Sequence, residues 1–208
     1  MSQVGSPSGQ AVRAVVLGSA SPRRRELVQL LGLDVPVRIE ASDADETLPP
    51  DLAPAEAAEW LALRKASSVR ERLGAEAEGS VIIGADTIVV LDGAILGKPK
   101  DAGDARRMLR LLQGRAHEVI TGVAVLDGST GRSKTARSVT RVFMKPLDEA
   151  RIARYVATGE PLDKAGAYGI QGLAAGFVER IEGCYFNVVG LPVSLLGDLL
   201  GAFGVRTI

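Results

Sequence analysis

The sequence is poor in the two residues that most often build metal and redox sites. It contains one cysteine, Cys184, and one histidine, His117, in 208 residues. A lone cysteine excludes an intrachain disulfide framework and a cysteine-based zinc site, and it suits a reducing compartment. A lone histidine excludes a multi-histidine metal site. A Ser-His-Asp triad would require His117, but no nucleophile-elbow motif accompanies it.

Neither sign of charge is in excess, because 25 Lys and Arg residues balance 25 Asp and Glu residues. The chain therefore lacks the overall basic field that drives sequence-independent binding to nucleic acid. Aromatic residues make up only 4% of the chain and form no stripe interleaved with basic residues. We expect no nucleic-acid partner, so local patches must carry any anion binding.

Long hydrophobic runs are also missing. No stretch approaches the roughly 20 apolar residues that span a bilayer, and the first dozen residues contain no apolar signal core. We expect no membrane partner and a cytoplasmic location. The remaining composition, 46% hydrophobic and 24% charged, is that of an ordinary globular protein. The first residues are rich in Ser, Gly and Gln, which predicts a disordered leader over residues 1–11. The length and composition of the rest predict a single domain over residues 12–208.

Three consecutive arginines follow a predicted helix start, which is the wrong end of a helix for positive charge. Ser21-Pro22 is typical of an N-cap and a first-turn proline, and residues 23–25 are the arginines. The first turn already carries the positive pole of the helix dipole, so cations there favour a bound anion. A short buried strand, 14–17, and a small-residue turn precede the helix, as in phosphate-binding loops. The alternative is a solvated basic helix face.

Hydrophobic periodicity predicts a chain in which strands and helices alternate. The predicted strands cover residues 14–17, 35–39, 80–91, 117–126 and 133–144, the last two forming an antiparallel hairpin. The predicted helices cover residues 54–73, 101–112, 147–158 and 192–200, after a first helix from residue 22 with Leu27, Leu30 and Leu31 as its apolar stripe. Residues 177–181 and 185–189 suggest a final hairpin. We interpret His117 as structural, since it starts a strand.

Two charged residues stand in predicted apolar surroundings. Asp86 interrupts the buried run 80–91, and a buried carboxylate without partners would cost several kcal/mol. It should therefore meet a cation, a metal or several donors, or else cap a bend between two short strands. Lys65 shares a helix face with apolar residues, so it either points inward or extends along apolar surface with its amine in water. For Lys65 the second reading is slightly favoured.

Residues 163–172 form a glycine-rich segment that also carries Asp, Lys, Tyr and Gln. Small residues let a backbone approach a ligand closely, and polar side chains at fixed offsets supply contacts. The alternative is an ordinary turn with a few polar groups. Together with Gly97-Lys98-Pro99, the arginines, Lys65, Glu46 and Asp86, this segment suits a polyphosphate and a divalent metal. Asp86 is then the natural base for a water, and Glu46 the natural co-ligand of the metal.

Four motifs resemble those of the Maf family: Ser19-Ala-Ser-Pro-Arg-Arg24, Gly84-Ala-Asp-Thr87, Gly97-Lys98-Pro99 and Asp163-Lys-Ala-Gly-Ala-Tyr-Gly-Ile-Gln-Gly172. The resemblance covers the chain from about residue 12 onward. It implies a pyrophosphatase that converts a nucleoside triphosphate to the monophosphate with Mg²⁺ or Mn²⁺. It also implies a homodimer and an α/β fold with an elongated mixed sheet flanked by helices. In that fold, two lobes surround a central cleft, as in inosine triphosphate pyrophosphatases.

The same resemblance implies a role for each matching residue. Asp86 would accept the proton, and Glu46 would join it at the metal. Specificity would rest on Arg23, Thr87 and Gln171, and the phosphate site would be lined by Ser19, Arg24, Lys65 and Lys98. The chain resembles the dTTP/UTP branch, because another branch typically has an aromatic residue at the position of Arg23. Arg25 falls at a variable position.

The chemistry of an amide side chain agrees with that branch. Gln171 offers a donor and an acceptor side by side, which complement the O4 acceptor and the N3–H donor of uracil or thymine. Cytosine presents the reversed pattern, and an amide can flip, so its rejection would need a second fixed contact. A second hypothesis is a non-catalytic nucleotide-binding regulator of cell division. A pure anion binder, however, has no need of Asp86 and Glu46 beside a phosphate.

Overall fold

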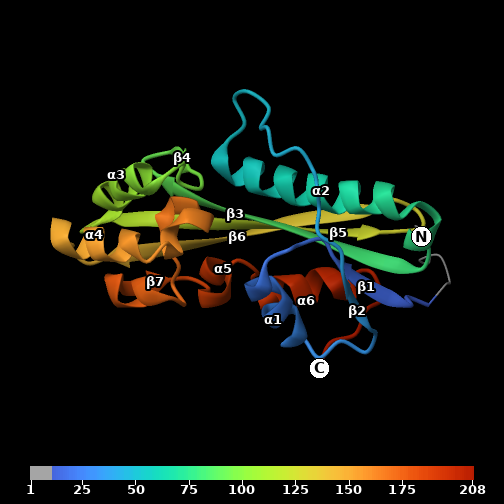
Figure 1. Cartoon of the computed structure of the whole chain (residues 1–208). Helices are drawn as coiled ribbons and strands as arrows, with labels where there is room; N and C mark the ends of the chain where they lie inside the picture. Colours follow the sequence, from blue (N-terminus) through green and yellow to red (C-terminus); the bar gives the residue numbers. More distant parts are fainter. Residues whose placement is uncertain (1–10) are drawn as a thin grey trace, which may run out of the picture.

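A single seven-stranded mixed sheet runs the length of the molecule in the computed structural model, which describes residues 11–208 (Figure 1). The strands are β1 (Ala14–Leu17), β2 (Val37–Ile39), β3 (Ser80–Leu91), β4 (Ala94–Leu96), β5 (Ala116–Asp127), β6 (Ser133–Met144) and β7 (Val178–Glu182). Their order is β2-β1-β3-β5-β6-β7, and β4 also pairs with β3. β1 is parallel to β2 and β3, whereas every other pair is antiparallel.

Helices cover both faces of this sheet. They are α1 (Pro22–Gln29), α2 (Pro54–Leu73), α3 (Ala102–Leu112), α4 (Glu149–Ala157), α5 (Tyr185–Val189) and α6 (Val193–Gly201). The long α2 lies on one face, α1 and α6 lie on the other, and α3 and α4 stand at the far end (Figure 1). The predicted mixed α/β fold, with its sheet flanked by helices, is therefore confirmed.

The core is divided between the two ends of the sheet. One cluster of buried residues packs α1 and α6 against β1 and includes Leu17, Val28 and Leu196. A second cluster joins α3 and α4 to the opposite end and includes Leu109 and Ile152. The long strands β3 and β5 contribute residues to both clusters, so they connect the two halves.

One edge of β3 is shared between two short strands that leave a gap. β1 pairs with residues 80–83 of β3, and β4 pairs with residues 89–91. Residues 84–88 have no strand partner on that edge, while β5 pairs with them on the other. Because successive side chains of a strand point to opposite faces, Asp86 and Thr87 lie on opposite sides of the sheet at this gap. β3 is continuous there, so the alternative of a bend at Asp86 is wrong.

Two glycines bring α2 into direct contact with the sheet backbone. A Cβ at Gly84 would lie 2.0 Å from the carbonyl oxygen of Ala62, and a Cβ at Gly122 would lie 2.1 Å from that of Ala58. No real side chain tolerates such distances, so only glycine fits at either position. Gly122 is directly opposite Asp86 in the β3–β5 pair. The small residues therefore determine how closely α2 approaches Asp86.

The predicted hairpin over residues 177–189 is wrong in its second half. Val178–Glu182 is a strand, but Tyr185–Val189 is the short helix α5. The reason is Asn187, which is fully buried and bonds across β5 and β6. Its amide nitrogen donates to the carbonyl of Val119 and to Thr140, each at 2.9 Å, and its amide oxygen accepts from the Thr121 N–H at 3.1 Å. These contacts outweigh the local preference of an aromatic and β-branched segment for strand.

Two smaller predictions about the N-terminal part are corrected or left open. The buried apolar residues of α1 are Leu27 and Val28, and Leu31 just beyond its end is also buried, whereas Leu30 is 61% exposed. The predicted disordered leader falls almost wholly on residues 1–10, which lie outside the described residues.

Within residues 11–208, no helix has both the length and the hydrophobicity needed to cross a bilayer.

Replacing Gly84 by alanine should destabilise the protein by about 3 kcal/mol, because the added methyl group overlaps the α2 backbone and forces the helix away from the sheet. The free energy of unfolding from urea titration measures this loss. Gly201→Ala on α6 is the matched control, since its Cβ would meet nothing within 4 Å. Equal stability of the two variants would contradict a direct contact between the α2 backbone and the sheet at Gly84.

Candidate active site

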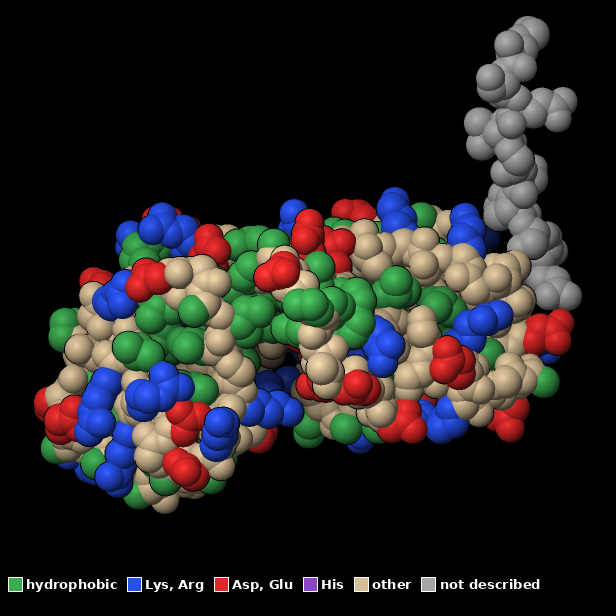
Figure 2. Space-filling model, turned by 90° about the horizontal axis from the view of Figure 1, so that it is seen from above, with side chains coloured by type: hydrophobic (Ala, Val, Ile, Leu, Met, Phe, Trp, Pro, Cys, Tyr) green, Lys and Arg blue, Asp and Glu red, His purple; other side chains and the backbone are tan. Residues whose placement is uncertain are grey.

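A cleft of about 910 Å³ opens at the gap in the edge of β3. Figure 2 shows the molecule hollowed near its middle, with Lys and Arg side chains close to the opening. All nine residues that the sequence predicts for the site line this cleft: Ser19, Arg23, Arg24, Glu46, Lys65, Asp86, Thr87, Lys98 and Gln171. They come from α1, α2, β3 and the intervening loops, so segments far apart in sequence build one cavity.

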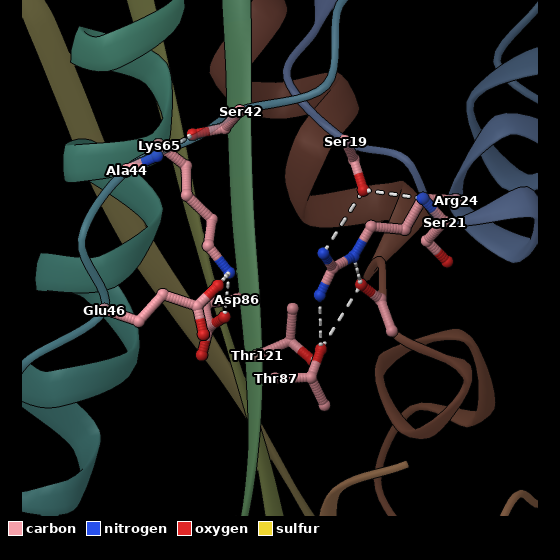
Figure 3. Close-up of polar contacts among 11 residues, drawn as sticks. Ser19, Ser21, Arg24, Ser42, Ala44, Glu46, Lys65, Asp86, Thr87 and Thr121 are labelled. Atoms are coloured by element: carbon pink, nitrogen blue, oxygen red, sulfur yellow. Dashed lines mark hydrogen bonds and ion pairs between the residues drawn. The ribbon is translucent and has the colours of Figure 1, made fainter. Parts of the chain in front are cut away.

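The centre of the cleft is a lysine held between two carboxylates (Figure 3). The Lys65 Nζ on α2 lies 2.5 Å from Asp86 Oδ1 and 2.8 Å from Glu46 Oε1. The side chains of Lys65 and Asp86 are only 13% and 12% exposed, whereas that of Glu46 is 58% exposed. Lys65 therefore points inward, and the favoured alternative of an amine in water is wrong. The buried Asp86 has the cationic partner that its place in an apolar run required.

The electrostatics of Glu46 reflect the same cluster. Burial alone would raise the pKa of the Glu46 carboxyl, but the hydrogen bond and charge of Lys65, helped by Lys98, lower it below its ordinary value. Glu46 is thus kept ionised in a cleft whose other charged lining residues are five cations and three carboxylates: Arg23, Arg24, Lys65, Lys98 and Lys164, and Asp86, Glu160 and Asp163. An ionised carboxylate beside several cations is the arrangement expected where a metal and a polyphosphate are to be bound together.

Arg24 lies on the other side of β3 and bonds to three parts of the chain (Figure 3). Its Nε donates to the carbonyl of Gly190 at 2.8 Å, its Nη2 to Thr87 Oγ1 at 3.0 Å and its Nη1 to Ser19 Oγ at 3.4 Å. Burial lowers the pKa of Arg24, with the charge of Asp86 acting in the opposite direction. Three donors are therefore engaged within the protein, and its role as a phosphate ligand stays a prediction.

The neighbouring arginines differ in their exposure. Arg23 is partly buried and lines the cleft, whereas Arg25 is exposed outside it. Ser21 occupies the N-cap position of α1, but its side chain makes no capping hydrogen bond. Its N–H instead donates to Ser19 Oγ at 3.2 Å. The first turn of α1 thus faces the cleft without its predicted side-chain cap.

The glycine-rich segment lines the cleft and contains the tight turn Ala165–Ala167, and a second tight turn, Glu160–Asp163, leads into it. It contacts the Gly97-Lys98 loop through a hydrogen bond of 3.1 Å from the Gly166 N–H to the Gly97 carbonyl. Gln171 is exposed at the rim. The segment is therefore an ordered part of the cleft wall, joined by a hydrogen bond to the neighbouring loop.

A buried pair that sequence reasoning did not connect supports this wall from behind. His117 is 3% exposed, and its Nε2 lies 2.7 Å from the hydroxyl of Tyr168. Its Nδ1 has no hydrogen-bond partner within the described residues, and burial lowers the pKa of His117 to about 4. Its structural role agrees with the sequence interpretation. The partner could not be foreseen, because 51 residues separate the two side chains.

The carboxylates of the cleft fit a hard divalent cation that takes its remaining oxygen ligands from bound phosphates. Within residues 11–208, no group of three or more His, Cys, Asp or Glu side chains could hold a metal ion. Of the four carboxylates that line the cleft, Glu46 and Asp86 are the two that share Lys65, and Mg²⁺ commonly takes one or two carboxylates from a protein when phosphates supply further oxygens. The residues therefore fit a metal that arrives with a nucleotide.

Sequence comparison finds known proteins that are similar to this chain over most of its length. Residues 14–203 match the family model described as Maf-like protein. A dTTP/UTP pyrophosphatase from Pelotomaculum thermopropionicum is 52% identical over 197 residues, covering 95% of this chain and 100% of the relative. One from Alkaliphilus metalliredigens is 53% identical over 186 residues, covering 89% and 94%. A solved nucleoside-triphosphatase (dITP/XTP pyrophosphatase) from Mycobacterium abscessus has 17% identity and a TM-score of 0.40, covering 63% and 72%.

The buried His117 should make stability fall as the pH drops from about 6.5 to about 4. The unfolded chain takes up a proton at the ordinary pKa of 6.5, whereas the folded protein takes it up only near 4. The wild type should thus lose about 3 kcal/mol more than His117→Gln between pH 7 and pH 4. Urea unfolding at both pH values measures the difference, and equal losses would contradict a buried neutral imidazole.

Proposed function

The chain belongs to the Maf family, and on that basis we propose that it hydrolyses dTTP and UTP to the nucleoside monophosphate and pyrophosphate. Relatives that carry this name are about half identical to it over nearly their full length. The observation that carries the proposal is the Lys65–Asp86–Glu46 cluster inside a cleft lined by further cations. A binder of nucleotides alone would gain nothing from carboxylates next to the phosphates, so the regulator hypothesis is not favoured.

Different residues of the cleft have different roles in the proposed reaction. Lys65, Lys98 and Arg24 neutralise the triphosphate, and the first turn of α1 presents N–H groups to it. A water oxygen bonds to the α-phosphorus, and the bond from that phosphorus to the bridging oxygen of the β-phosphate breaks. The water's proton passes to the Asp86 carboxylate, and pyrophosphate leaves with the electron pair of the broken bond.

A divalent cation, Mg²⁺ or Mn²⁺, would be held by Glu46 and Asp86 together with the phosphates. When bound, such an ion neutralises phosphate charge and lowers the pKa of a coordinated water. The Lys65 ammonium stands between the two carboxylates in this structure, so it would share them with the ion or yield one of them. Lys65 keeps the two carboxylates together until a nucleotide enters.

Base choice rests on residues at the other side of the cleft. The Gln171 amide pairs with the O4 acceptor and N3–H donor of uracil or thymine, and Arg23 is the second specificity position. The Thr87 hydroxyl is already shared with Thr121 at 2.9 Å and with Arg24 at 3.0 Å. We therefore expect Thr87 to act on specificity through the position of Arg24. A homodimer and a cytoplasmic location are further proposals that rest on the family resemblance.

The decisive test incubates the protein with each common and modified nucleoside triphosphate and with Mg²⁺ or Mn²⁺. We expect equal amounts of monophosphate and pyrophosphate, with dTTP and UTP turned over faster than dCTP, CTP or the purines. Ion chromatography separates pyrophosphate from orthophosphate, and a reaction without metal is the control. Release of orthophosphate, or no turnover of any nucleotide, would contradict the proposed reaction.

A further inference from the structure

Glu160 is a glutamate of the cleft wall that belongs to none of the four motifs. Its carboxylate contacts the turn that carries Gln171. Its Oε2 accepts the backbone N–H of Leu173 at 3.0 Å, and its Oε1 accepts the hydroxyl of Tyr155 at 3.0 Å. Its main-chain carbonyl accepts Lys164 Nζ at 2.7 Å. Glu160 is thus connected to both the start and the end of the glycine-rich segment.

Tyr155 on α4 holds the Glu160 carboxylate in place through its hydroxyl. The Tyr155 side chain is buried, and burial together with Glu160 raises the pKa of the hydroxyl. The turn itself is closed by a hydrogen bond of 3.2 Å from the Gly172 N–H to the Gly169 carbonyl. The carboxylate therefore holds Leu173, and the hydrogen bond between Gly172 and Gly169 closes the turn around Gln171.

Gly172 shows how tightly the carboxylate fits against this turn. A Cβ at Gly172 would lie 2.2 Å from Glu160 Oε1. The absence of a side chain there lets the carboxylate sit against the backbone of the turn. Gln171 is exposed, and no hydrogen bond holds its side chain in the described part of the chain. The position of its amide consequently depends on the backbone that carries it.

We infer that Glu160 is a positioning residue that sets the base selectivity of the cleft by fixing the turn on which Gln171 is presented. The inference rests on the proposed function, in which Gln171 pairs with the base. Gln171 can distinguish uracil from cytosine only when its amide meets the edge of the base, and the position of that amide follows the backbone of the turn. The hydrogen bond from Leu173 fixes this backbone, so Glu160 determines where the Gln171 amide meets the base.

The chemistry of position 160 provides a matched pair of variants. In Glu160→Ala the Leu173 N–H and the Tyr155 hydroxyl lose their acceptor, and the turn is released. In Glu160→Gln the amide oxygen can accept from Leu173 while the amide nitrogen donates to the Tyr155 oxygen. Glu179→Ala removes an exposed carboxylate from β7 and is the control for loss of charge.

Steady-state kinetics with UTP and CTP should separate these variants. Glu160→Ala should reduce the ratio of kcat/KM for UTP over CTP roughly tenfold, mainly through a higher KM for UTP, as expected for one lost hydrogen-bonding arrangement. Glu160→Gln and Glu179→Ala should keep the wild-type ratio. In a Gln171→Ala background, Glu160→Ala should change the ratio little, because the group it positions is gone. Unchanged selectivity in Glu160→Ala, or an equal loss in both backgrounds, would overturn the inference.

Hydrogen exchange tests the positioning without relying on turnover. The Leu173 amide should exchange at least tenfold faster in Glu160→Ala than in the wild type, and at the wild-type rate in Glu160→Gln. If the wild type releases no pyrophosphate, the proposed function fails, and exchange still decides whether Glu160 holds the turn. Slow exchange of Leu173 in Glu160→Ala would overturn the inference even if the enzyme is active.

Discussion

The close contact between α2 and the backbone of β3 and β5 is the constraint on which the site depends. Gly84 and Gly122 leave no side chain between helix and sheet, so the helix backbone at Ala58 and Ala62 lies directly on the strands. At this distance Lys65, one turn further along, reaches Asp86 with its ammonium group. A larger residue at either glycine would lift the helix and leave Asp86 as a buried carboxylate without its partner.

The second requirement is the gap between β1 and β4. Because residues 84–88 of β3 have no strand partner on one edge, the cleft reaches both faces of the sheet around this edge. Asp86 contacts Lys65 on the α2 face, while Thr87 contacts Arg24 on the other. In the proposed reaction, consecutive residues of one strand would serve chemistry and specificity separately, because side chains alternate along a strand.

Much of this arrangement could be predicted from the sequence, and the features that could not be predicted depend on tertiary contacts. Hydrophobic periodicity located α2 and β3, because that signal is local in the chain, and the resemblance to a known family indicated all nine cleft residues. The helix α5 was missed, because buried contacts of Asn187 override the preference of its neighbours. The Arg24–Gly190 contact and the position of Glu160 depend on tertiary structure, and the former joins residues 166 positions apart.

The central claim is that Asp86, held by Lys65, accepts the proton of the attacking water, and replacement of Asp86 by asparagine tests it most directly. Asparagine keeps the shape and an oxygen for Lys65, but it cannot take the proton. We predict a fall in kcat with UTP of about a thousandfold, with nucleotide binding by calorimetry kept within a few fold. Asp198→Asn, an exposed change on α6, should leave kcat unaltered. An Asp86→Asn enzyme with near-normal kcat would contradict the account.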